Sequence, residues 1–131
     1  MDWQVFDAYE LSSHIIRSAQ QCNTLIDNYI DERTFTQLAK KQAHVRVIIR
    51  TQVEPHGNNA LSKQLALDLA KANEQYGNFE VKTLTKSHDR FLIIDDTEVY
   101  HLGASLKDLG KRLFAFTKLH AETANSLLNA L

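Results

Sequence analysis

Apolar residues recur at helical spacing in two long stretches of the chain. In Tyr9–Gln20 the residues Leu11, Ile15 and Ala19 are four apart, with Ile16 beside them, which predicts an amphipathic helix. A second helix is predicted over Ala60–Tyr76 and ends at Gly77-Asn78. The apolar face expected for this second helix consists of Leu61, Leu65, Leu69, Ala72 and Tyr76.

Shorter segments are rich in β-branched residues or alternate between apolar and polar positions, as strands do. Two short helices complete the pattern: Glu32–Lys41, with Asp31 as its N-cap, and Glu122–Leu131. Asp95-Asp96-Thr97-Glu98 joins two strands as a hairpin turn. The predicted strands are Leu25–Tyr29, Val45–Arg50, Phe79–Leu84, Arg90–Ile94, Val99–Leu102 and Leu113–Thr117.

Strands separated by helices early in the chain, followed by a late hairpin, indicate an α/β fold with a mixed β-sheet and helices on both faces. A chain of 131 residues fits a single domain over residues 1–131. The side chains expected in the core are Ile26, Val47, Ile49, Leu65, Leu69, Ile93 and Phe116.

Composition narrows the class of protein. Apolar residues make up 44% and charged residues 24% of the chain, close to the average for globular proteins. No apolar run approaches the roughly 18 residues of a membrane span, and the N-terminus lacks the pattern of a signal peptide, so we expect a cytoplasmic protein. The lone Cys22 forms no internal disulfide, and we interpret it as a small apolar residue of a strand.

The net charge of −1 provides no overall attraction to nucleic acid, so polyanion binding requires a local cluster of cations. One candidate cluster follows residue 104, where the sequence contains four cations and two acidic residues, Asp108 and Glu122. A solvated surface with scattered lysines explains the same charges equally well. The four cations are Lys107, Lys111, Arg112 and Lys118.

The segment His88–Asp95 carries the clearest chemical motif. Its sequence, His-Asp-Arg-Phe-Leu-Ile-Ile-Asp, is followed by Gly-Ala-Ser-Leu-Lys-Asp-Leu-Gly at Gly103–Gly110 and by Phe-Ala-Phe at Phe114–Phe116. This series resembles the phospholipase D superfamily. More narrowly, it is similar to a bacterial phospholipase D-like domain that is often joined to an N-terminal DNA-binding module.

The chain departs from the enzyme pattern of that superfamily, which is His-x-Lys-x4-Asp followed by Gly-Ser-x-Asn. Arg90 replaces the lysine, and Gly103 comes one residue late. Ala104 and Leu106 occupy the serine and asparagine positions, leaving Ser105 and Lys107 as polar substitutes. These changes place turnover in doubt and leave phosphate binding intact as an expectation.

The chemistry centres on His88 and Arg90, which share one face of a strand because they are two residues apart. A neutral imidazole can attack phosphorus, and a guanidinium can hold phosphate oxygens bidentately. The resemblance implies a metal-free, cofactor-free site built from two histidines, hence a homodimer that brings two copies of His88 together. Asp95 would orient the histidine or the neighbouring backbone, and Ser105 and Lys107 would assist Arg90 in binding phosphate.

Other side chains are weaker candidates. The remaining histidines show no spacing typical of a zinc site, and adjacent Asp95 and Asp96 usually face water in a turn. Asp27 and Tyr29 end an early strand that this fold places near the motif, where packing and capping are the expected roles.

Three hypotheses remain open at this stage. The chain is a phosphate-binding module acting on or near nucleic acid as a homodimer with little or no turnover. Alternatively, it is a metal-independent phosphodiesterase or nuclease with His88 as nucleophile. The third possibility is an oligomerisation domain of a DNA-binding protein, either fused or separate.

Overall fold

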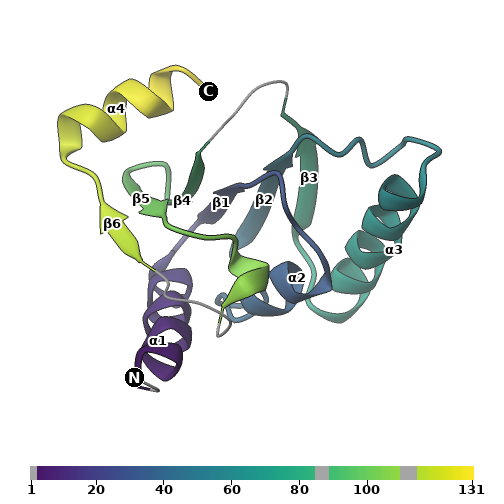
Figure 1. Ribbon diagram of the computed structural model, residues 1–131, viewed down its shortest axis with the longest axis horizontal. Helices are drawn as coiled ribbons and strands as arrows, with labels where there is room; N and C mark the ends of the chain where they lie inside the picture. Colours follow the sequence, from purple (N-terminus) through teal and green to yellow (C-terminus); the bar gives the residue numbers. More distant parts are fainter. Residues whose placement is uncertain (1–2, 85–88, 110–114) are drawn as a thin grey trace.

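The structure is a computed structural model that describes residues 3–84, 89–109 and 115–131, with side chains from residue 8 onward. One six-stranded sheet crosses the molecule in the order β3-β2-β1-β4-β5-β6 (Figure 1). The first three strands pair in parallel, and the last three are antiparallel to their neighbours. The strands are β1 (Cys22–Ile26), β2 (Arg46–Thr51), β3 (Phe79–Thr83), β4 (Arg90–Ile94), β5 (Glu98–Leu102) and β6 (Phe116–Lys118).

Within the described residues, four α-helices cover the sheet on two sides. The helices are α1 (Trp3–Ser18), α2 (Glu32–Leu38), α3 (Ala60–Gln75) and α4 (Ala121–Asn129), and a short 3-10 helix, η1, spans Leu106–Asp108. Residues of α1, α2 and α3 share one core with Leu25, Val47 and Ile49. A smaller core on the opposite face joins Ile26, Ile93 and Val99 to Ala124 of α4, and Figure 1 shows this helix apart from the other three. The predicted mixed sheet with helices on both faces is confirmed.

Local sequence explains the ends of the helices. Asp31 caps α2 through a capping box with Thr34, as predicted for this aspartate. Gly77 and Asn78 both adopt positive φ after α3, which ends that helix where the sequence indicated. In the β4–β5 turn, Asp95 and Asp96 are both left-handed, with φ of 53° and 57°, the geometry that matches the twist of paired strands.

Strand β1 lies three residues earlier than predicted, at Cys22–Ile26 instead of Leu25–Tyr29. Two polar residues, Asn23 and Thr24, are buried within it, and the Asn23 side-chain amide donates to the Ile16 carbonyl of α1. The strand stops at Ile26 because the Asp27 carboxylate accepts from the backbone N–H of Tyr29, which turns the chain.

The predicted core is largely correct, with exceptions at the edges. Leu69 and Phe116 are only partly buried, and Leu61 and Tyr76, at the two ends of α3, are 70% and 42% exposed. A 16-residue helix is roughly 24 Å long, whereas a five-residue strand spans about 17 Å. The helix is thus longer than the strands of the sheet that it packs against, which fits the exposure of Leu61 and Tyr76 near its two ends. The described part of the last predicted strand begins at Phe116, and Leu113 and Phe114 lie outside the described residues.

Truncation of Leu65 tests the packing of α3. Leu65 is buried in the main core, so Leu65→Ala should lower the free energy of unfolding by about 2–5 kcal/mol in a denaturant titration. Leu67 lies on the same helix but is 48% exposed, so Leu67→Ala should change stability by no more than about 0.5 kcal/mol. A wild-type midpoint for Leu65→Ala would contradict the placement of this helix.

Candidate functional site

The candidate site lies where the end of β1 meets the beginning of β4. The antiparallel ladder between these strands ends at the pair Ile26–Phe91, so Asp27 and Arg90 emerge next to each other. Ser105, the residue that precedes η1, lies at the same place. Three segments that are distant in sequence thus converge on one point.

A short chain of hydrogen bonds links the three side chains. The Nε of Arg90 donates to the hydroxyl of Ser105 at 3.0 Å, and that hydroxyl donates to Oδ1 of Asp27 at 3.0 Å. Arg90 Nε also lies 3.6 Å from the same carboxylate oxygen. The guanidinium is therefore held by one edge, through a neutral hydroxyl and a buried carboxylate.

Asp27 is buried, and its surroundings set its electrostatics. Burial raises the pKa of its carboxyl above the ordinary value, and the hydrogen bonds from Tyr29 and Ser105 and the charge of Arg90 oppose that rise only in part. Oδ1 accepts both hydrogen bonds, whereas Oδ2 is buried without a partner among the described residues. The hydrogen bonds therefore compensate the buried carboxylate only in part, a condition that is typical of functional sites.

Arg90 itself reaches the surface. Its side chain is 32% exposed, and its guanidinium lies 5.7 Å from the centre of the Tyr29 ring. Tyr29 is 61% exposed. Within the described residues, only the Nε edge of Arg90 makes hydrogen bonds, so its terminal amino groups lie beside an exposed aromatic ring with donors to spare.

The two polar substitutes of the motif occupy different environments. Ser105 is buried, and its hydroxyl is engaged by Arg90 and Asp27, so it supports Arg90 from behind. Lys107 is partly exposed on η1 and bonds the Asp108 carboxylate at 3.0 Å. It follows Ser105, the hydrogen-bond partner of Arg90, by two residues and is therefore close to the site.

Asp95 lies at the opposite end of β4 from Arg90. Its carboxylate accepts hydrogen bonds from the backbone N–H groups of Gln20, Gln21 and Cys22 at 2.7–3.1 Å. Partial burial would raise the pKa of Asp95, but these three donors outweigh it and lower that pKa below its ordinary value. Among the described residues, its contacts are therefore with the backbone that leads into β1.

Several predicted site residues are not placed. His88, Lys111 and Arg112 lie outside the described residues. Lys118 pairs with Glu98 at 2.6 Å, and His101 lies 3.5 Å from the Asp89 carboxylate.

In the part of the chain that the structure describes, no group of three or more potential ligands is arranged to hold a metal ion, and no helix is long and apolar enough to cross a membrane.

Asp27 is the site residue that the sequence analysis undervalued. It does cap the end of β1, as expected, but the same carboxylate also holds Ser105 and faces Arg90. The available signal was an acid directly after an apolar strand, in Leu-Ile-Asp. That signal is local, whereas the partners lie more than 60 residues away.

The opposite pKa shifts of Asp27 and Asp95 give a test by pH. Because the folded state raises the pKa of Asp27, the contribution of this group to stability is present below pH 3.8 and is lost as pH rises through the folded-state pKa. For Asp95, whose pKa is lowered, the contribution is present above pH 3.8 and is lost as pH falls through the folded-state pKa. As pH rises through the acidic range, the free energy of unfolding of wild type should therefore fall relative to that of Asp27→Asn. Over the same range it should rise relative to that of Asp95→Asn.

The two asparagine variants serve as controls for each other, since each removes one carboxylate and keeps its shape. Asparagine also tolerates the left-handed backbone at residue 95. The same sign of pH dependence in both variants would contradict the environments described for these two acids.

Comparison with solved structures supports the fold. No protein-family model and no curated protein matches the chain. NucT from Helicobacter pylori, a phospholipase D-like nuclease, matches with a TM-score of 0.66 and 17% identity, over 99% of this chain and 88% of NucT.

TrmBL2, an archaeal chromatin protein whose structure shows a novel mode of DNA binding, matches with a TM-score of 0.57 and 18% identity. That match covers 96% of this chain but 46% of TrmBL2, so the chain spans a little under half the length of TrmBL2. At these identities the comparison concerns the fold alone, and it confirms the α/β, phospholipase D-like fold predicted from the sequence.

Proposed function

We propose that this chain is a phosphate-binding module that acts on nucleic acid through Arg90, as a homodimer with little or no turnover. The observation that carries the proposal is the anchoring of Arg90 by Ser105 and Asp27 at the end of β1. A guanidinium fixed by one edge loses little conformational entropy when its other edge binds phosphate oxygens.

The setting of Arg90 fits an extended polyanion better than a buried small ligand. The side chain of Arg90 is partly exposed and lies beside the exposed ring of Tyr29. A nucleic-acid strand could therefore place a phosphate against the guanidinium and a base against the ring. Fold likeness to NucT and to the DNA-binding TrmBL2 is consistent with a role in nucleic-acid biology.

Low turnover is proposed because two polar groups of the enzyme pattern are replaced by apolar residues in the described part of the chain. Ala104 and Leu106, at the serine and asparagine positions of that pattern, are both buried and provide no polar side chain. Ser105 is occupied by Arg90 and Asp27. Ser105 therefore positions Arg90, and none of the three residues is arranged to transfer a proton.

A phosphodiesterase of the phospholipase D type is the second candidate, favoured by the likeness to the nuclease NucT. In this function His88 would attack phosphorus, and His88 of the second copy would protonate the leaving oxygen. Because one chain has a single such motif, this function requires the homodimer more strictly than binding does.

Removal of Arg90 tests the binding function. Arg90→Ala should weaken binding of a short labelled oligonucleotide by about 1.5–3 kcal/mol, the range for a charge-assisted hydrogen bond, as measured by fluorescence anisotropy. Arg46→Ala is the matched control, because Arg46 is exposed on β2 and has no ion pair among the described residues. A double variant, Arg90→Met with Asp27→Asn, removes both charges together and avoids leaving a buried unpaired carboxylate. Equal affinity for wild type and both Arg90 variants would exclude this function.

The same variants separate binder from enzyme. If the chain is an enzyme, His88→Ala abolishes cleavage, Arg90→Lys preserves or raises it, and EDTA has no effect because imidazole is the nucleophile. Hydrolysis of a generic phosphodiester that resists EDTA and is lost in His88→Ala would overturn our preference for binding without turnover.

The homodimer is tested by light scattering. We expect a mass about twice the 15.0 kDa of one chain at high micromolar concentration. A mass equal to one chain would count strongly against the phosphodiesterase and would leave phosphate binding by a monomer as the function.

A further inference from the structure

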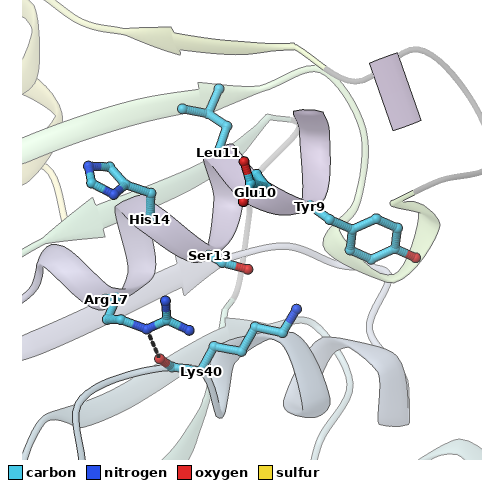
Figure 2. A pocket seen from close by; sticks show the side chains of 7 residues that line it. All are labelled: Tyr9, Glu10, Leu11, Ser13, His14, Arg17 and Lys40. Atoms are coloured by element: carbon cyan, nitrogen blue, oxygen red, sulfur yellow. Dashed lines mark hydrogen bonds between the residues drawn. The ribbon is translucent and has the colours of Figure 1, made fainter. Parts of the chain in front are cut away.

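A groove between α1 and the end of α2 lies apart from Arg90 on the described surface. Figure 2 shows the side chains of α1 and Lys40, which follows α2, around one open space. The groove has a volume of about 730 Å³, within the range of roughly 300–1,000 Å³ for ligand sites. Its lining includes Tyr9, Ser13, Arg17 and Lys40.

The groove is assembled before any ligand arrives. The hydroxyl of Tyr9 donates to the Leu109 carbonyl at 2.8 Å, which fixes the ring, and the Lys40 ammonium lies 5.6 Å from the centre of that ring. Arg17 donates through Nε to the backbone carbonyl of Lys40 at 3.4 Å (Figure 2). Both cations are therefore held at the groove, which reduces the entropy lost on binding.

The charge of the groove is unbalanced. Arg17 and Lys40 form no ion pair with any carboxylate of the described residues, whereas Arg33, Lys107 and Lys118 each have one. Glu10 is the one acidic residue among the groove's lining side chains. In a chain with a net charge of −1, this local excess of positive charge favours an anionic ligand.

The groove also continues toward the site of Arg90. A smaller hollow of about 200 Å³ shares Tyr9 and Lys40 with it and is lined in addition by Arg33 and Lys107. Lys107 in turn follows Ser105 by two residues, and the Ser105 hydroxyl accepts a hydrogen bond from Arg90. A hollowed surface thus leads from Arg17 and Lys40 to the neighbourhood of Arg90, and an elongated surface of this kind suits a chain of phosphates better than a single anion.

We infer that the α1–α2 groove binds the phosphates of a single nucleic-acid strand that extends from Arg90, with Arg17 and Lys40 as the contacts. This inference rests on the proposed function, because Arg90 sets where the strand begins. A strand short enough to occupy only Arg90 does not reach the groove, and a longer strand does.

Strand length therefore provides the test. Two labelled single-stranded oligonucleotides of about 4 and about 16 nucleotides are titrated by fluorescence anisotropy at several salt concentrations. In Arg17→Gln combined with Lys40→Gln, the longer strand should bind about tenfold more weakly, and its salt slope should fall by roughly 1.4, or about 0.7 for each lost contact. Binding of the shorter strand should not change.

The control variant, Lys63→Gln combined with Lys71→Gln, removes the same charge from exposed positions of α3 and should bind both strands like wild type. If the double groove variant does not fold, Arg17→Gln alone loses one exposed hydrogen bond and half of the effect remains measurable.

The outcomes separate the two proposals. If the short strand binds through Arg90 but the groove variants bind the long strand like wild type, the groove inference is wrong and the proposed function stands. If the short strand does not bind while the long strand binds in a manner that depends on Arg17 and Lys40, the groove binds nucleic acid and the role of Arg90 is wrong. Equal weakening by the α3 control would show a general charge effect and refute the groove, and no binding of either strand would refute both.

Discussion

The buried carboxylate of Asp27 is the constraint on which the arrangement of the site depends. A charged group out of water must be compensated, and the hydrogen-bond donors that compensate it come from the Tyr29 backbone and the Ser105 side chain, with Arg90 as the nearby cation. These partners belong to the β1–α2 connection, the segment before η1, and the first residue of β4. Satisfying one carboxylate therefore fixes three segments and orients the guanidinium at the surface.

The two ends of β4 are fixed by acids in opposite environments. At one end Arg90 faces Asp27, whose pKa is raised by burial. At the other end Asp95 is held by three backbone donors, and its pKa is lowered despite partial burial. A shift of β4 by one residue would break both arrangements and exchange the side chains that it contributes to the two cores. The position of Arg90 is thus specified by contacts at both ends of its strand.

Most of the fold could be predicted from local patterns, because strands such as Arg90–Ile94 and the caps at Asp31 and Gly77 depend on nearby residues. The errors arose where distant partners decide. Asn23 is polar yet buried within β1, because its amide bonds the Ile16 carbonyl of α1. In the site, the motif identified Arg90 and Ser105, but Asp27 becomes recognisable only when the sheet brings it beside them.

The charges around Arg90 decide what kind of binding this fold supports. Its guanidinium faces a carboxylate, and the nearby cations Lys107 and Arg33 each have an acidic partner, so the site has little net charge to attract a phosphate from a distance. In the proposed function, Arg90 provides a donor edge in a fixed geometry, which would determine where a phosphate is held once it arrives. Under the proposed function, attraction would then come from cations without such partners, and Arg17 and Lys40 meet that condition in the described structure. In the proposed function, long-range attraction and local positioning would thereby fall to different residues, which would allow a chain with a net charge of −1 to bind a polyanion.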